Sequence, residues 1–215
     1  MPAFPREELE EMMERWLEAN RNAEREGDWS TYLGAHYTDD AVYRWNVGPN
    51  EEFWARGLKE IKEVALGYHM EGFEDWAYPY DTVLIDEKQG QVVGFWRQVA
   101  PFKRADGSNY EIAGVGGSWF KYAGDFKWSW QRDFFDFGNA KSIFMELAGA
   151  GHLNSTIRAK IHQQAKAGAE LLPGHETLRP NAGTLEKLKN LQAMVRIALC
   201  TKSEKTFPSA APGRK

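Results

Sequence analysis

Apolar residues near the start of the sequence recur every three or four positions. Over residues 6–25 one face carries glutamates, and the opposite face carries Leu9, Met12, Met13, Trp16 and Leu17. This spacing is typical of an amphipathic helix. Asp28 follows, and its side chain is of a type that caps helices. A short second helix with Trp29, Tyr32 and Leu33 is therefore expected after it.

The segment between residues 39 and 67 predicts one strand and one helix. Asp39-Asp40 introduces a brief strand over residues 41–46. A third helix is expected over residues 51–66, because Asn50 can cap its start and Gly67 can end it.

From residue 82 onward the apolar period shortens to two, which is typical of strands. The expected strands cover residues 82–86, 91–100, 110–122 and 126–137. Their connections are short, and the Asp106-Gly107 pair is a strong hairpin signal. Four strands joined in this way form a meander, most simply a curved antiparallel sheet.

The last third of the chain returns to helical spacing. Asn139 can cap a helix that runs to Leu147, and Thr184 can cap the last helix. Between them lies a further helix, ended by Pro173-Gly174 and marked by Ile157, Ile161 and Ala165. Residues 202–215 are expected to form a disordered tail.

Together these elements predict an α+β fold. Three N-terminal helices inside a strongly curved sheet enclose a cone, and such a shape contains an interior pocket. The cone domain is expected over residues 1–145 and a C-terminal helical extension over residues 146–201. Because a curved sheet has a second face that often packs on a partner, we also expect a homo-oligomer, a dimer or trimer.

Composition narrows the range of functions. The net charge of −4 and the pI of about 5.8 argue against a nucleic-acid partner. No apolar run approaches a membrane span, and the first residues lack the features of a secretory signal, so a cytoplasmic location away from membranes is expected. With the single cysteine, Cys200, no intrachain disulfide can form. The 9 Trp, 8 Tyr and 12 Phe lie mostly between residues 29 and 144, which favours a pocket for a planar apolar ligand.

Two charged residues interrupt apolar strand positions. Arg97 alternates with Val93, Phe95 and Val99, so it is either an anion donor in the pocket or half of an ion pair at a sheet edge. Asp133 lies among bulky rings, where burial would raise its pKa into a useful acid–base range. The alternative is a structural salt bridge. The catalytic hypothesis requires Arg97 and Asp133 to reach into one shared hollow.

Two further residues have polar groups suited to this chemistry. Tyr43 could hold a substrate oxygen, or it could be a core residue with a satisfied hydroxyl. His69, at the end of the third helix, is the most suitable imidazole acid or base, with a solvated surface histidine as the alternative. The five histidines lack paired metal-ligand spacing, and Gly114-Val115-Gly116-Gly117 falls inside a strand, so neither a metal nor a dinucleotide cofactor is expected.

Four segments, taken in order, resemble the nuclear transport factor 2-like superfamily and within it the SnoaL-like branch. They are Asp39–Tyr43, Gly94–Arg97, Gly117–Gly124 and Gln131–Asp136, and the resemblance covers about residues 6–145. It implies the same cone. Its members include ketosteroid isomerase, scytalone dehydratase, polyketide cyclases and limonene epoxide hydrolase, which mostly act without cofactors.

The resemblance to the epoxide hydrolase site is incomplete. Tyr43, Arg97 and Asp133 resemble its tyrosine, arginine and final-strand aspartate. Its second aspartate corresponds to Val99 here, and its asparagine corresponds to Trp45. Epoxide opening is therefore in doubt.

The chain also resembles the lignin diarylpropane (gamma-formaldehyde) lyases of this superfamily, which turn a two-ring diol into a stilbene with loss of water and formaldehyde. This implies a cofactor-independent lyase on a hydroxylated aromatic compound. Asp133 or His69 would move protons, Arg97 and Tyr43 would orient oxygens, and the rings would be held by Trp45, Trp54, Tyr80 and Phe95. The alternatives are a steroid or polyketide isomerase, hydratase or cyclase, and a non-catalytic carrier of small molecules.

Overall fold

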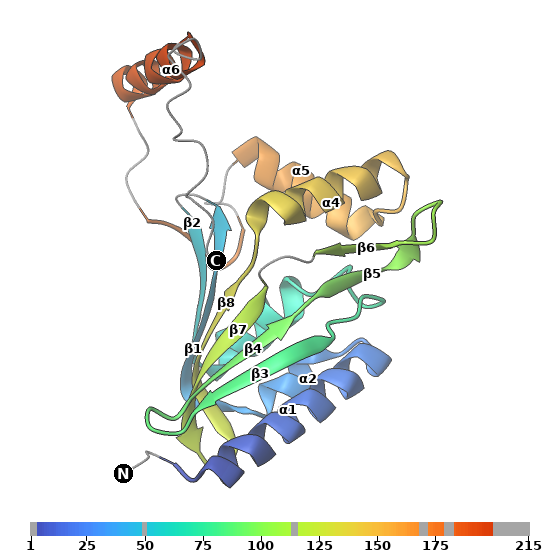
Figure 1. Cartoon of the computed structure of the whole chain (residues 1–215), viewed down its shortest axis with the longest axis vertical. Coiled ribbons are helices and arrows are strands. Elements are labelled where there is room, and N and C mark those ends of the chain that lie inside the picture. Colours follow the sequence, from blue (N-terminus) through green and yellow to red (C-terminus); the bar gives the residue numbers. More distant parts are fainter. Residues whose placement is uncertain (1–3, 49–50, 113–115, 168–171, 179–182, 200–215) are drawn as a thin grey trace, which may run out of the picture. The chain divides into compact units, whose positions relative to one another are not determined.

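The computed structural model describes residues 4–48, 51–112, 116–167, 172–178 and 183–199. The chain forms two compact units, Met1–Leu178 and Arg179–Lys215. Helix α6 (Thr184–Leu199) belongs to the second unit and begins at the predicted residue. The tail predicted over residues 202–215 lies outside the described residues. The first unit contains all the other described helices and strands (Figure 1).

The first two helices form as their apolar spacing predicts. Helix α1 (Arg6–Glu26) buries the predicted face, including Leu9, Met12 and Trp16. The Asp28 carboxylate accepts a hydrogen bond from the Thr31 backbone N–H at 2.9 Å and so caps helix α2 (Trp29–Gly34).

The third predicted helix is wrong over its first half. Strand β1 (Tyr37–Gly48) is longer than predicted, and residues 51–56 form strand β2 (Glu51–Arg56), which pairs antiparallel with it. Helix α3 (Gly57–Glu60) begins only afterwards and continues into the π-helix η1 (Ile61–Tyr68). Phe53 and Ala55 are buried and lie two positions apart, as in a strand. In a segment of only six residues, the sequence pattern does not distinguish such a strand from one face of a helix.

The main sheet contains seven of the described strands, in the order β3-β4-β7-β8-β1-β2-β9. All neighbours are antiparallel except β1 and β8, which run parallel. The remaining bounds are β3 (Tyr80–Asp86), β4 (Gln91–Trp96), β7 (Gly117–Gly124), β8 (Lys127–Phe134) and β9 (His175–Thr177). The predicted fold class, α+β with a curved sheet, is confirmed.

The predicted strand over residues 91–100 is interrupted at Arg97. After this break, β5 (Gln98–Lys103) leaves the main sheet and pairs with β6 (Asn109–Ile112) in a separate hairpin. Helices α4 (Phe137–Gly149) and α5 (Ser155–Ala167) lie beside this hairpin (Figure 1). Helix α4 is capped by Asp136, which accepts the Asn139 N–H at 3.0 Å, and not by Asn139 itself.

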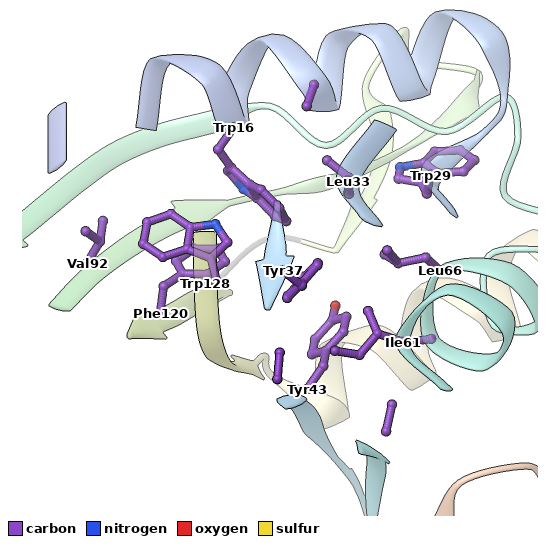
Figure 2. Packing of buried hydrophobic residues seen from close by; sticks show 14 of the residues in the cluster. Trp16, Trp29, Leu33, Tyr37, Tyr43, Ile61, Leu66, Val92, Phe120 and Trp128 are labelled. Atoms are coloured by element: carbon purple, nitrogen blue, oxygen red, sulfur yellow. The ribbon is translucent and has the colours of Figure 1, made fainter. Parts of the chain in front are cut away.

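The core lies between the inner face of the main sheet and the helices α1, α2 and η1 (Figure 2). Trp16 is at its centre, with its ring 5.2 Å from that of Phe120 and 5.8 Å from that of Tyr37. A second cluster joins α4 and α5 to β6 through residues such as Ile112, Ile143 and Leu147. None of the helices in the described ranges is long and apolar enough to span a membrane.

The outer face of the main sheet carries partly exposed rings. Trp119 and Trp130 lie 5.2 Å apart on β7 and β8, and Trp119 is exposed. A homo-oligomer that uses this face stays a prediction.

Candidate active site

A hollow with a volume of about 90 Å³ lies between the sheet and the inner helices. We call it the central hollow. It is lined by Trp16, Asn20, Trp29, Leu33, Tyr43, Leu66, Met70, Tyr78, Tyr80, Trp96, Ser118, Gln131 and Asp133. In Figure 2 the Tyr43 hydroxyl points toward the space that Leu33 and Leu66 border. Among these lining residues Asp133 is the single carboxylic acid, and no lysine, arginine or histidine accompanies it.

Asp133 is held by three side chains, one from its own strand β8 and one from each of the neighbouring strands β7 and β1. One carboxylate oxygen, Oδ2, accepts a hydrogen bond from the Tyr43 hydroxyl at 2.6 Å. The other, Oδ1, accepts from the Ser118 hydroxyl at 2.6 Å and from the Gln131 amide at 2.7 Å. The pairing of Ser118 with Asp133 across β7 and β8 places these groups side by side. Both oxygens are thus oriented before any ligand arrives.

Burial raises the pKa of Asp133 above its ordinary value, because a charged carboxylate loses its hydration inside the hollow. The hydrogen bonds from Gln131, Ser118 and Tyr43 oppose this shift by favouring the charged form. A buried carboxyl with a raised pKa holds its proton more readily than a free one, which suits an acid–base group.

The tyrosines around the hollow remain protonated. Burial, followed by the charge of Asp133, raises the pKa of Tyr43 well above its ordinary value. Burial likewise raises the pKa of Tyr78 and Tyr80. The Tyr80 hydroxyl accepts the Trp16 indole N–H at 3.0 Å. These hydroxyls therefore act as hydrogen-bond groups or relays, because a free tyrosinate is too costly here.

A glycine makes room for one of these rings. A Cβ added at Gly94 on β4 would lie 2.5 Å from the ring of Tyr80. Gly117 on β7 leaves room for a different ring, since a Cβ there would lie 2.7 Å from both the Gly94 carbonyl oxygen and the ring of Phe134. The wall beside Tyr80 is thin because Gly94 lacks a side chain.

The expectation that Arg97 shares the hollow with Asp133 is wrong. The Arg97 guanidinium faces outward, 2.9 Å from Asp81 and 3.0 Å from Glu111, as in the ion pair that was the alternative. The alternation that placed it beside Phe95 ends at Trp96, where the strand breaks. Phe95 also faces away from the hollow, 6.0 Å from the Phe134 ring, because Gly94 and Trp96 occupy the inner face of β4.

Replacing Arg97 with alanine is therefore expected to leave turnover within about twofold of the wild type. Arg97 makes two ion pairs, and each is worth roughly 0–1 kcal/mol, so the free energy of unfolding should fall by no more than about 2 kcal/mol. Steady-state kinetics and urea unfolding check both values. A loss of turnover of more than tenfold would mean that Arg97 takes part in catalysis.

His69 lies half-buried in a ring cage outside the central hollow. Its ring stacks at 5.3 Å on that of His175 and contacts Phe53 at 4.7 Å and Trp45 at 5.3 Å. Its Nε2 lies 3.1 Å from the Pro173 carbonyl oxygen. Burial lowers the pKa of His69 to about 4, so the ring is neutral at pH 7. The structure does not bring this imidazole to Asp133.

The predicted ring-holding residues divide between the two faces of the sheet. Tyr80 lines the central hollow as expected. Trp45 lies behind Tyr43, 5.1 Å from its ring, and supports it without reaching the hollow. Trp54 belongs to β2 and stacks between the guanidinium groups of Arg44 and Arg56, at 4.4 and 4.7 Å.

Sequence reasoning missed Ser118 and Gln131. Both are polar residues at inward positions among rings, the same signal that identified Asp133. Gln131 is fixed in turn by the Tyr37 hydroxyl, which donates to its Oε1. Ser118 accepts the Trp96 indole N–H at 2.8 Å. The carboxyl therefore has a second layer of partners that restrict its movement.

No group of three or more His, Cys, Asp or Glu among the described residues is placed to hold a metal ion. No protein-family model matches the chain, and no curated protein matches it.

Several solved structures are similar to this chain. PrhC from Penicillium brasilianum is 13% identical, covering 72% of this chain and 96% of its own, with a TM-score of 0.48. An LEH-like epoxide hydrolase of M. tuberculosis is 19% identical, covering 65% and 90%, with a TM-score of 0.44. A putative SnoaL-like polyketide cyclase from Jannaschia is 16% identical, covering 60% and 90%, with a TM-score of 0.43.

Proposed function

We propose that this chain is a cofactor-independent lyase that acts on a hydroxylated aromatic compound, with Asp133 as its acid–base group. The observation that carries the proposal is the Asp133 carboxyl itself, buried in an aromatic hollow and hydrogen-bonded to Tyr43 at 2.6 Å. The six aromatic rings in the lining suit a planar substrate, and the tyrosine hydroxyls suit its oxygens. The motif resemblance to the nuclear transport factor 2-like superfamily supports the same class of chemistry.

One carboxyl is sufficient for a reaction that first consumes and then returns a proton. The proposed substrate is a lignin-derived diarylpropane diol, which would lose water and formaldehyde to give a stilbene. In the first step Asp133 protonates Tyr43 as Tyr43 protonates the benzylic hydroxyl, which leaves as water. The electron pair of the broken C–O bond departs with that water, and the para phenol stabilises the electron-poor carbon.

In the second step the proton moves in the opposite direction, from the ligand toward Asp133. The terminal hydroxyl gives its proton to Tyr43 as Tyr43 returns a proton to Asp133. The C–C bond to the terminal carbon breaks, that carbon leaves as formaldehyde, and the bond's electrons form the stilbene double bond. The diol thus yields stilbene, one water and one formaldehyde, and the protein ends in its starting protonation state. The high pKa of Tyr43 suits a relay that never rests as tyrosinate.

The test offers a diarylpropane diol and a 3-ketosteroid to the purified protein in parallel. Formaldehyde and stilbene in equal amounts are expected from the diol, and the steroid is expected to return unchanged. Conjugated enone from the steroid would instead favour an isomerase, in which Asp133 acts first as a base. Binding of the diol without any turnover would favour a carrier.

A further inference from the structure

A second hollow, of about 180 Å³, shares a wall with the central one. We call it the outer hollow, and its lining is Gly27, Asp28, Trp29, Ser30, Leu66, Gly67, Met70, Glu71 and Glu74. Trp29, Leu66 and Met70 line both hollows and therefore stand between them. Met70 is unbranched and changes rotamer at low cost, so this wall can open to admit a ligand.

The charges along this route are negative. The outer hollow has three carboxylates, Asp28, Glu71 and Glu74, and the central hollow has Asp133. No lysine, arginine or histidine lines either hollow among the described residues. Glu24, which accepts the Tyr78 backbone N–H at 2.7 Å, adds a further half-buried acid.

Nearby cations offset only part of this charge. Lys160 lies 3.7 Å from the Glu71 carboxylate, and Lys62 acts on Asp28 from a distance. Arg21 acts on Glu24 in the same way. None of these three cations lines a hollow, so none is positioned to pair with a ligand inside.

We propose that the ligand reaches Asp133 from the outer hollow and that it is an uncharged phenolic compound, with ring carboxylates excluded. This rests on the proposed function only in taking the central hollow as the ligand site. A ligand carboxylate would pass the three carboxylates of the outer hollow, lose its hydration in a ring-lined space and gain no cation there. A neutral phenol loses much less hydration, and its hydroxyls find the hydroxyls of the surrounding tyrosines.

The experiment measures quenching of tryptophan fluorescence, because Trp16, Trp29 and Trp96 line the central hollow. The two probes are 4-hydroxystilbene and the same stilbene with a carboxylate on its second ring. At pH 7 the neutral probe is expected to bind at least about 30-fold more tightly. Equal affinity, tighter binding of the carboxylate, or binding of neither probe would overturn the proposal.

The route is tested by charge reversal in the outer hollow. Glu71→Lys is expected to raise the association rate constant of the carboxylated probe at least about threefold at low ionic strength, and to leave that of the neutral probe unchanged. Glu14→Lys is the matched control, because Glu14 is exposed on α1 and its replacement changes the net charge equally. The same acceleration in both variants, or none in Glu71→Lys, would place the entrance elsewhere.

The ligand class and the lyase activity can fail independently, and the experiments tell the two failures apart. Preferential binding of the neutral probe with no turnover of the diol would reject the lyase and keep the ligand class. Turnover of diols that carry ring carboxylates as rapidly as neutral ones would reject the ligand class and keep the lyase.

Discussion

Asp133→Asn is expected to lower kcat on the diol by about 10²- to 10⁴-fold, the range that general acid–base groups contribute. The amide keeps the shape of the carboxyl, so its oxygen can still accept from Ser118 and Gln131. It cannot deliver or recover a proton at neutral pH. Steady-state formaldehyde release measures the loss, and ligand binding should remain within about threefold.

The same variant has an expected effect on stability that depends on pH. The folded-state pKa of Asp133 is raised above its unfolded value, so folding favours the protonated carboxyl. Its contribution to stability is present below the unfolded pKa and is lost as the pH rises through the folded pKa. Asparagine does not titrate, so the Tm of Asp133→Asn relative to wild type should be higher at pH 7 than at pH 4.

Asp81→Asn is the matched control for both measurements. It makes the same chemical change on β3, at an exposed carboxylate that pairs with Arg97 outside the hollow. Its kcat should stay within about twofold of wild type, as for other changes to exposed ion pairs. If Asp133→Asn kept more than about a tenth of the wild-type kcat, Asp133 would not be the acid–base group.

The placement of Asp133 was predictable from the sequence because its strand follows a tight turn. Asp125 and Phe126 have φ of 51° and 53°, and the turn pairs Gly124 with Lys127. Register is then set along the hairpin, and it brings Ser118 opposite Asp133. The inward face of β8 follows from the alternation of Trp128, Gln131 and Asp133 with exposed or half-buried neighbours, apart from one bulge.

The position of Arg97 was not predictable in this way. Both faces of β4 carry apolar residues, since Val92 faces the core and Val93 and Phe95 face outward. When both faces are apolar, alternation does not show which face points toward the core, and a one-residue error in the assignment exchanges the two faces. The strand also breaks at Arg97, whose backbone N–H donates to the Pro79 carbonyl at 3.1 Å. That bond comes from a segment distant in sequence, which no local pattern encodes.

The surroundings of His69 could not be predicted from the sequence either. Its ring cage depends on the pairing of β2 with β9, which places His175 opposite Phe53. Residues 175–177 have no strand signal of their own, and their conformation is stabilised by the free edge of β2. Without that pairing the sequence predicts a rim histidine, and with it the imidazole is half-buried among rings.

Tyr43→Phe is expected to lower kcat on the diol by about 10- to 1000-fold, because the hydroxyl that connects Asp133 to the ligand is removed. The pH dependence should change as well. The Tyr43 hydroxyl donates to the Asp133 carboxylate and favours its charged form, so its loss raises the pKa of Asp133 further.

Whether that shift occurs tests whether Tyr43 acts on Asp133 or only orients the ligand. The proposed first step needs protonated Asp133, so wild-type activity should fall as the pH rises through its folded pKa, and in Tyr43→Phe this decline should begin at higher pH. Tyr122→Phe is the matched control, since the Tyr122 hydroxyl donates to Glu8 at 2.6 Å and lies outside the lining of the hollow. A pH profile of kcat measured for all three proteins decides the matter. A lower kcat with an unshifted decline would mean that Tyr43 only orients the ligand, and an unchanged kcat would remove it from the proton path, leaving Ser118 as the hydroxyl that contacts the carboxyl.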